Sequence, residues 1–169
     1  KEGYIVRDKQ TKKFSLSPAV HRLSNGFDDE AWVAEIVNPL LRKLTKELSL
    51  PAILAVPIGE SMMVRSSSDH EAPLAIQKLN IGDDAPMMDV PTGHVYLAYC
   101  NDETRAKYLA WLAQSENRRQ SLAKSPEWFE KIVEKIRSQG YLIVEFTQSK
   151  HRSVAIAVPV IVNGKIFGS

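Results

Sequence analysis

The stretch from residue 140 to residue 164 constrains the fold more than any other part of this sequence. Gly140 is typical of a helix C-terminus, and the apolar run at residues 141–146 after it has the composition of a strand. A second strand-like run, residues 153–162, ends at Asn163-Gly164, a dipeptide that strongly favours a hairpin turn. The chain is therefore predicted to place a helix before strands that reverse direction and pair antiparallel.

Further strands are predicted in the first half of the chain. Polar or Gly/Pro-containing turns separate short apolar runs there, which is typical of hairpins. The runs lie at residues 3–7, 13–16, 52–56, 61–65 and 74–81. The polar residues 66–71 are predicted to form a loop, and residues 82–84 are predicted to end the last strand.

Four helices are predicted from apolar residues spaced three and four apart. The first runs from residue 28 to residue 48, with a kink or a restart at Pro39. A short helix is expected after Gly93, and another after Asn101 and Asp102. The fourth begins at Ser125-Pro126 and ends near Gly140. Hairpins instead of regular strand–helix–strand alternation favour an α+β fold, with helices packed on an antiparallel sheet.

Composition excludes several classes of protein. A chain of 169 residues with 44% hydrophobic and 25% charged residues fits one globular unit and excludes disordered or collagen-like chains. No apolar run approaches the roughly 20 residues that span a bilayer, so a cytoplasmic location is expected. The net charge of +2 gives little indication of nucleic-acid binding, and only the first 13 residues are locally basic. Both ends look cut, so we expect a fragment of a longer protein.

The sequence offers little support for catalysis. His94 and Cys100 are six residues apart, which on a helix places them on different faces and makes a Cys-His pair geometrically poor. Cys100 is the only cysteine and is expected to be buried and inert. The histidines are scattered without metal-ligand spacing, and no phosphate-binding glycine loop is present. We therefore expect no catalytic residue, no metal and no cofactor.

Two features are compatible with binding of a small ligand. Thr92-Gly93, just before a predicted helix, offers a hydroxyl and free backbone N–H groups to an anionic oxygen, or Thr92 simply caps the helix. Alternation along residues 153–158 places Ser153, Ala155 and Ala157 on one face of a strand. These small residues leave room either for a ligand or for a closely packed helix.

Several motifs, in this order and spacing, resemble one known family over nearly the whole chain. They lie at residues 3–8 (Gly-Tyr-Ile-Val-Arg-Asp), 14–18 (Phe-Ser-Leu-Ser-Pro), 44–54, 81–82 (Ile-Gly), 85–87 (Ala-Pro-Met), 93–98 (Gly-His-Val-Tyr-Leu-Ala), 140–141 (Gly-Tyr) and 152–155 (Arg-Ser-Val-Ala). Taken together, these motifs resemble the effector-binding region of bacterial IclR-type transcriptional regulators. Residues 96–100 (Tyr-Leu-Ala-Tyr-Cys) are similar to members that control the catabolism of aromatic acids.

The resemblance implies a GAF-like or profilin-like fold, with an antiparallel sheet flanked by helices and a pocket on one side. Residues 1–27 would be the remnant of a winged helix-turn-helix wing and its linker, and residues 28–169 a C-terminally truncated effector-binding domain. The implied partners are a small organic-acid effector, operator DNA bound by a missing N-terminal domain, and further copies in a homodimer or homotetramer. By position, the implied pocket residues are Leu74, Gln77, Ala85, Pro91, Thr92, Val144 and Ser153.

The sequence also departs from the family pattern. The strand after Gly140-Tyr141 has one acidic residue, Glu145, where many relatives have acidic residues. Pro159 and Val160 stand where the family pattern has an aromatic residue and then an acidic or amide residue. These changes imply a more apolar pocket, suited to a larger or aromatic ligand. Two other functions stay open: an enzyme that uses His94 or Cys100 in the same cleft, and a pure assembly module whose interface is the exposed side of the helix at residues 32–48.

Overall fold

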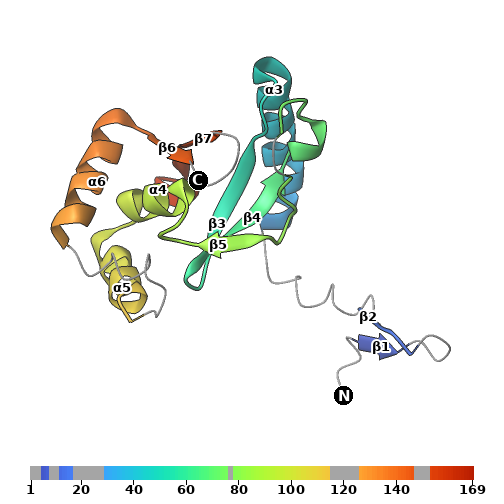
Figure 1. Cartoon of the computed structure of the whole chain (residues 1–169), viewed down its shortest axis with the longest axis horizontal. Coiled ribbons are helices and arrows are strands. Elements are labelled where there is room, and N and C mark those ends of the chain that lie inside the picture. Colours follow the sequence, from blue (N-terminus) through green and yellow to red (C-terminus); the bar gives the residue numbers. More distant parts are fainter. Residues whose placement is uncertain (1–4, 8–11, 17–28, 76–77, 115–125, 147–152) are drawn as a thin grey trace.

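The computed structural model describes residues 5–7, 12–16, 29–75, 78–114, 126–146 and 153–169 (Figure 1). Within these residues, helices pack against antiparallel strands, so the predicted α+β class is confirmed. The predicted N-terminal hairpin is present as β1 (Ile5–Arg7) and β2 (Phe14–Leu16), with Val6 opposite Ser15.

The first long helical segment restarts at Pro39, as predicted. It consists of α2 (Asp29–Trp32), a wide turn η2 (Val33–Val37) and α3 (Asn38–Leu48). The backbone N–H of Asn38 donates to the carbonyl of Val33, five residues earlier, so the helix is widened just before Pro39. This geometry suits proline, which has no N–H to give to the carbonyl four residues back.

The central strands are β3 (Ile53–Ile58), β4 (Ser61–Ser67) and β5 (Asp84–Pro86), in the antiparallel order β3-β4-β5. The pairing of β3 with β4 matches the predicted hairpin, with Val56 opposite Met63. A short helical turn, η3 (Asp69–Glu71), follows β4.

The predicted strand at residues 74–81 is wrong. Its described part consists of turns and irregular backbone, and the strand comes later, as β5. The side chain of Asp83 accepts from the backbone N–H of Asn80 and holds this segment in a local turn. Leu74 and Ile81 are exposed, so they provide no buried face on which a strand would pack.

Three helices follow in the order α4 (Pro91–Tyr99), α5 (Asp102–Leu112) and α6 (Pro126–Gln139). The last two match the predicted segments, and the Asn101 side chain caps α5 by accepting from the N–H of Thr104 at 2.7 Å. Helix α4 begins at Pro91, earlier than predicted, because proline is already preorganised for the first helical position. The predicted capping residue Ser125 lies outside the described residues.

The chain ends with β6 (Leu142–Phe146), β7 (Ser153–Ala157), β8 (Val160–Val162) and β9 (Lys165–Gly168). The single predicted strand at residues 153–162 is broken between Ala157 and Val160, where Pro159 has no N–H for a strand ladder. Asn163 and Gly164 have positive φ, as a reversing turn requires, and β9 returns to pair with β8. Ala55 and Ser169 exchange two backbone hydrogen bonds and join β9 to β3.

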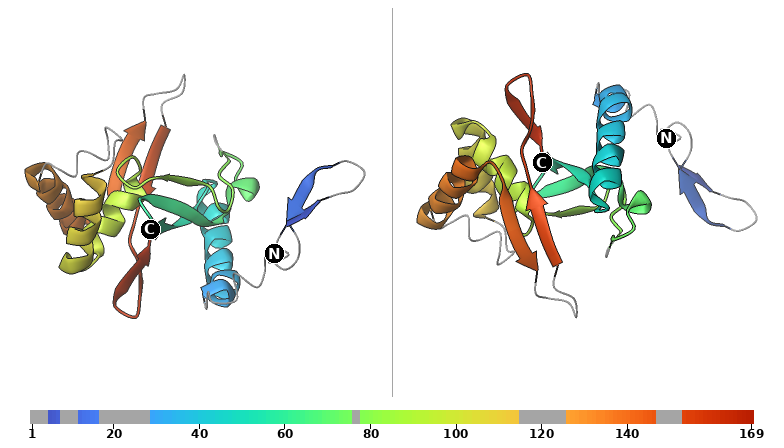
Figure 2. Two further views of the ribbon diagram at one scale, coloured as in Figure 1. Left: turned by 90° about the horizontal axis from the view of Figure 1, so that it is seen from below. Right: turned by 90° about the horizontal axis from the view of Figure 1, so that it is seen from above.

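The two sides of this strand assembly carry different helices. Figure 2 shows α4, α5 and α6 on one side of the β6–β7 pair and α3 on the other. Alternate residues of the strands follow this division: Ala55 and Ala157 belong to the large core under α4 and α6. Leu54, Val160 and Phe167 belong to a smaller core under α2 and α3.

Two polar contacts connect α3 to β4 and to the residue that follows it. The hydroxyls of Thr45 and Ser68 are 2.6 Å apart, and the Ser66 hydroxyl donates to the side-chain oxygen of Asn38. Thr45, Ser66 and Ser68 are all buried, and each is satisfied by a specific partner. These directional contacts fix the position of α3 along the strand.

Candidate functional site

The residues implied by the resemblance lie on four different elements. Ala85 is on β5 opposite Met62, Pro91 and Thr92 form the first turn of α4, Val144 is on β6, and Ser153 starts β7. Leu74 lies in a turn and is 60% exposed, and Gln77 lies outside the described residues.

The inner side of the β6–β7 pair brings two of these residues together. Val144 is opposite Ala155, and Ser153 is two residues before Ala155 on the same side of the sheet. Both side chains are half-buried, and Val144 packs against the core that includes Val95 and Ala98 of α4. Helix α4 therefore lies across the small-residue side of β7. This contact matches the packed-helix interpretation of the small residues and leaves ligand binding there as a proposal.

Close packing fixes the first turn of α4. A Cβ atom at Gly93 would lie below 3.0 Å from backbone atoms of Met87, so only glycine fits without a shift. The Met87 N–H in turn donates to the carbonyl of Glu60 at the β3–β4 turn. The first turn of α4 is thus held against Met87, which is itself bonded to the β3–β4 hairpin.

The start of α4 combines the positive end of a helix with one nearby acidic residue. The N-cap residue is Val90, whose side chain provides no capping hydrogen bond, and the first turn contains no acidic residue, but Asp89 directly precedes Val90 and its charge acts on His94. Thr92 lies within the first turn and is not the cap, which corrects the capping interpretation. The positive end of the helix dipole and the Thr92 hydroxyl are therefore close together, and this combination suits a carboxylate oxygen.

His94 projects from the same turn region toward the β5–α4 connection. Its Nε2 atom is 3.2 Å from the carbonyl oxygen of Met88. Burial lowers the pKa of His94 below its usual 6.5, while the hydrogen bond to Met88 and the charge of Asp89 oppose that shift. His94 is therefore held mainly in its neutral form near pH 7.

Cys100 has the surroundings of a structural thiol. It is buried at the end of α4, and its Sγ atom donates to the carbonyl of Leu97 at 3.3 Å. Burial raises the pKa of the Cys100 thiol, although Arg105 and Arg137 oppose that shift. A buried thiol with a raised pKa is a poor nucleophile, so the geometry gives no support to Cys-based catalysis.

Two arginines that the sequence analysis did not single out bind the C-terminal end of α4. Arg105 donates to the Cys100 carbonyl and pairs with Asp102, and the Nε atom of Arg137 donates to the Ala98 carbonyl at 2.7 Å. These carbonyls have no partner within the helix, so the guanidinium groups satisfy them and complement the negative end of the helix dipole. The sequence places an arginine near an end of each of two predicted helices. It does not reveal that Arg137 contacts Ala98, because these residues are 39 positions apart in the chain.

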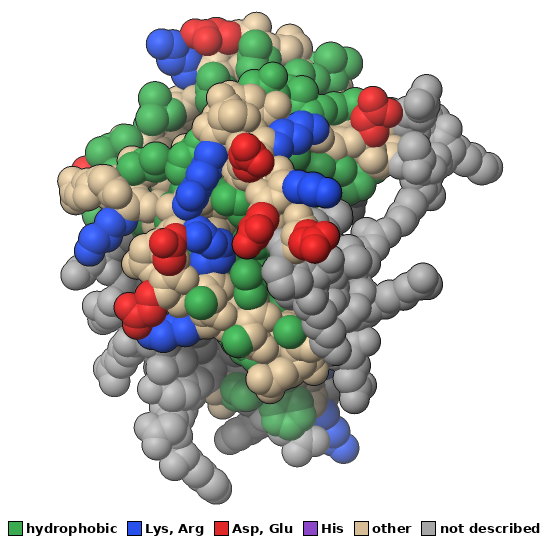
Figure 3. Space-filling model, turned by 90° about the vertical axis from the view of Figure 1, so that its left-hand side faces the viewer, with side chains coloured by type: hydrophobic (Ala, Val, Ile, Leu, Met, Phe, Trp, Pro, Cys, Tyr) green, Lys and Arg blue, Asp and Glu red, His purple; other side chains and the backbone are tan. Residues whose placement is uncertain are grey.

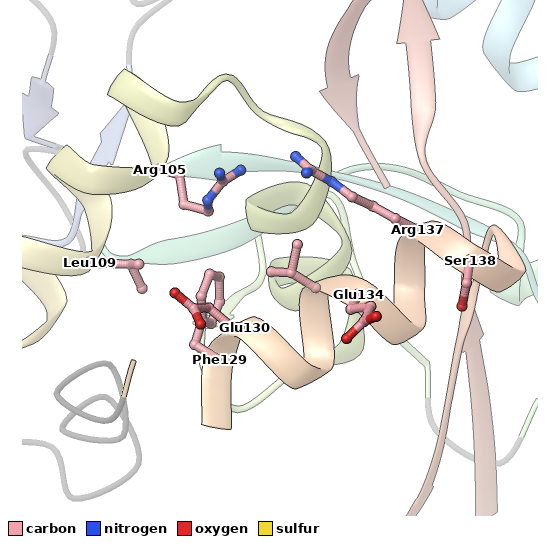
Figure 4. A pocket seen from close by; sticks show the side chains of 8 residues that line it. Arg105, Leu109, Phe129, Glu130, Glu134, Arg137 and Ser138 are labelled. Atoms are coloured by element: carbon pink, nitrogen blue, oxygen red, sulfur yellow. The ribbon is translucent and has the colours of Figure 1, made fainter. Parts of the chain in front are cut away.

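The same arginines border a groove of about 720 Å³ between α5 and α6 (Figure 4). Its floor is apolar, and its rim combines the two arginines with Glu130 and Glu134. Figure 3 shows this face of the molecule, with positive and negative side chains interspersed among hydrophobic ones. None of the six implied pocket residues that the structure describes lines the groove.

Two further findings concern the described residues only. They contain no helix with the length and apolar character needed to cross a membrane. Nor does this part of the chain gather three or more His, Cys, Asp or Glu side chains in a position to hold a metal ion.

Comparison with known proteins places the chain among transcriptional regulators. Residues 29–164 match the family model described as bacterial transcriptional regulator IclR C-terminal. A C-terminal domain of a putative transcriptional regulator from Vibrio cholerae is similar in structure, with a TM-score of 0.65, 20% identity, and coverage of 86% of this chain and 82% of that one. At 20% sequence identity, this similarity shows a shared fold and no more.

Two longer structures are also similar. An IclR homologue from Microbacterium hydrocarbonoxydans, complexed with 4-hydroxybenzoate, has a TM-score of 0.71 and 16% identity over 98% of this chain and 67% of its own. The Thermotoga maritima IclR has a TM-score of 0.63 and 17% identity over 98% of this chain and 66% of its own. The chain thus spans about two thirds of the length of these two proteins.

Proposed function

This chain belongs to the family of bacterial transcriptional regulators defined by the IclR C-terminal domain, and from that membership we propose that it senses a small organic-acid effector. In the whole regulator, which would bind operator DNA through an N-terminal winged helix-turn-helix, effector binding would change the relative populations of two arrangements of a homodimer or homotetramer. We propose control of catabolic genes in the cytoplasm as the output.

The first turn of α4 carries this proposal. It combines the positive end of a helix dipole with the Thr92 hydroxyl, in a turn whose position is fixed by the packing of Gly93 on Met87. The proposed pocket extends from this turn toward Val144 and Ser153 on the inner side of the β6–β7 pair, with Ala85 and Pro91 beside it. Leu74 and Gln77 are proposed to complete it from the segment between η3 and β5.

An aromatic acid is the more specific form of the proposal. The described walls of the pocket are mostly aliphatic, and Glu145 is the only acidic residue of β6. The similar Microbacterium protein is complexed with 4-hydroxybenzoate, which supports an aromatic carboxylate as the first ligand to test. Apolar burial of the ring and a charge-assisted hydrogen bond to the carboxylate would contribute together.

Sensing without turnover is favoured over catalysis. The alternative enzyme would need His94 or Cys100 as a reactive group, but Cys100 is buried with a raised thiol pKa. His94 lies on α4 and Cys100 is its C-cap residue six positions later, a separation that keeps them from acting as a pair.

The test is calorimetric titration of the chain with 4-hydroxybenzoate and with a short aliphatic acid such as pyruvate. We expect saturable binding of the aromatic acid and a roughly tenfold higher dissociation constant for Thr92→Val, which removes one hydrogen bond worth about 1.4 kcal/mol. The matched control is Thr104→Val in the first turn of α5, which should bind like the unchanged chain.

Three results would contradict the proposal in different ways. Equal affinity in Thr92→Val would remove the first turn of α4 from the site. Tighter binding of the aliphatic acid would overturn the aromatic preference. Conversion of a bound acid to a product, lost in His94→Gln, would favour the enzyme.

A further inference from the structure

The groove between α5 and α6 is separate from the turn proposed to bind the effector. It lies beside the C-terminal end of α4, whereas Thr92 belongs to the first turn of that helix. Its volume of about 720 Å³ is within the range of about 300–1,000 Å³ that is typical of small-molecule sites. Its lining residues all come from α5 and α6. The groove is therefore a second concave surface, which the proposed sensing of an effector does not use.

Two arginines on one rim of the groove are held in fixed positions. Arg105 donates to the Cys100 carbonyl, and its side chain is only 18% exposed. The Nε atom of Arg137 donates to the Ala98 carbonyl, two residues before Cys100. The guanidinium groups therefore meet at one end of α4, and Figure 4 shows them pointing toward each other. This rim offers charged donors that are already ordered, as the binding of a carboxylate requires.

The positive charge of this rim is only partly neutralised within the chain. Arg105 pairs with Asp102. For Arg137, the described residues provide the Ala98 carbonyl and no acidic side chain within ion-pair distance. The terminal nitrogens of Arg137 can therefore donate to an anionic group of a ligand.

The floor of the groove is apolar. Phe129 and Val133 are buried and lie one turn apart on the same side of α6. Leu109 of α5 is half-buried and lies four residues after Arg105, so the same side of that helix carries both the charge and the apolar contact. A floor of this kind favours an aliphatic or aromatic group, which leaves water when it packs there.

Two glutamates complete the lining from α6. Glu130 and Glu134 are exposed and one helical turn apart, and Figure 4 shows both carboxylates below the two guanidinium groups. A simple carboxylic acid would be attracted by the arginines but would also meet these two negative charges. A ligand that carries an ammonium group beside its carboxylate matches both kinds of charge.

We propose that this groove binds a free amino acid with an apolar side chain. The two arginines would bind its α-carboxylate, the two glutamates its ammonium group, and the apolar floor its side chain. Each kind of lining side chain then meets a matching group of the ligand. The site uses no residue of the proposed effector pocket, so the two proposals can fail independently of each other.

The test is calorimetric titration of the chain with L-phenylalanine and with two analogues that each lack one charge. We expect saturable binding of L-phenylalanine. The analogue 3-phenylpropionate lacks the ammonium group, and phenethylamine lacks the carboxylate. Each should bind roughly tenfold more weakly, because one of the two charged groups of the groove is then left unmatched. An analogue that binds as tightly as L-phenylalanine would exclude recognition of both charges.

Glu134→Gln tests the ammonium contact without disturbing the fold, since Glu134 is exposed. It should weaken binding of L-phenylalanine roughly fivefold, the size of an exposed charge pair. It should not weaken binding of 3-phenylpropionate, which has no ammonium group. The matched control is Glu127→Gln, because Glu127 is an exposed glutamate of the same helix that does not line the groove. This control should bind L-phenylalanine like the unchanged chain.

Arg137→Gln tests the carboxylate contact. It should weaken binding of L-phenylalanine and of 3-phenylpropionate but not of phenethylamine, and Arg137→Lys should restore part of the loss because it keeps the charge. Circular dichroism checks that α4 keeps its helix when the bond to Ala98 is removed. If Arg137→Gln does not fold, the comparison of ligands in Glu134→Gln still tests the site.

Two further outcomes would overturn the proposal. Absence of saturable binding for both L-phenylalanine and L-leucine would mean that the groove is an ordinary solvated surface. Binding of L-phenylalanine that is lost in Thr92→Val and kept in Glu134→Gln and Arg137→Gln would place the amino acid in the first turn of α4. The unchanged chain and Glu134→Gln should bind 4-hydroxybenzoate equally, so a failure here leaves the test of the effector turn intact.

Discussion

The two sides of the strand assembly differ in how completely they are covered. Under α4 and α6 lies a core in which Met87, Val95, Leu97 and Ile136 are fully buried. Under α2 and α3 the buried cluster consists of Val33, Val37 and Leu54, flanked by partly buried residues. The large core orders the α4 turn proposed to bind the effector, while the small one borders a side of α3 on which Leu40 and Leu44 are exposed.

The comparison shows that side-chain size does not predict burial here. On β7 the small residues Ala155 and Ala157 face α4, whereas the larger Val154 and Ile156 are exposed. Small residues on the strand allow the helix axis to approach closely, and side chains of the helix then fill the space between them. Large exposed residues, in contrast, leave an apolar surface available to a partner.

The largest expected effect on stability comes from replacing one buried leucine by alanine in each of the two cores. Leu97→Ala in the large core should lower the free energy of unfolding by about 4 kcal/mol, whereas Leu54→Ala in the small core should lower it by about 2 kcal/mol. The smaller core is closer to solvent and can relax around the cavity. Equilibrium urea unfolding measures both. Equal losses would mean that the two cores are equally well packed.

The next effect tests how closely α4 approaches its support. Gly93→Ala should cost about 3 kcal/mol, because the new Cβ meets backbone atoms of Met87 that cannot move without moving the chain. The control Gly82→Ala has nothing within 4 Å and should cost only about 1 kcal/mol for its positive φ. If Gly93→Ala unfolds at the same urea concentration as the unchanged chain, the contact is looser than described.

A third comparison uses neighbouring positions of one strand. Ala157→Leu should lower the free energy of unfolding by about 2 kcal/mol, because it overpacks the buried side under α4. Val154→Leu, on the exposed side, should stay within about 0.5 kcal/mol. Thermal unfolding at low protein concentration measures both. A larger loss in Val154→Leu would reverse the assignment of the two sides.

The smallest effect concerns the buried imidazole on the well-covered side. Burial lowers the folded pKa of His94 below 6.5, so below about pH 6.5 the unfolded chain binds a proton that the folded chain does not. Stability should therefore fall between pH 7 and pH 5, and it should fall less in His94→Gln. His70→Gln, at an exposed residue, is the control. The same pH dependence in both variants would show that His94 is not the group responsible.

Local chemistry explains which elements could be predicted from the sequence. Asn101 caps α5 through its own side chain, and Pro126 starts α6 where a proline needs no hydrogen-bonded N–H. The start of α4 was predicted too late because Gly93 suggested a boundary, whereas close contact with Met87 explains that glycine inside the helix. The strand at residues 74–81 was predicted from apolar composition, which does not reveal that Leu74 and Ile81 are exposed.

The candidate site could be predicted only in part. The resemblance indicated Thr92, Val144 and Ser153, and the fold places them on α4 and on the strands that contact it. It gave no indication that Arg105 and Arg137 bind the far end of the same helix, because these contacts depend on how α5 and α6 fold back. Contacts between residues distant in sequence are set by tertiary packing and leave little local signal.

The hydroxyl contacts between α3 and β4 give this part of the molecule a mechanical property. Asn38 with Ser66 of β4, and Thr45 with Ser68 just after β4, attach the helix at two points almost two helical turns apart. Two hydrogen bonds this far apart restrain both sliding and rotation of α3 relative to β4. A displacement of that strand would therefore tend to carry the helix with it.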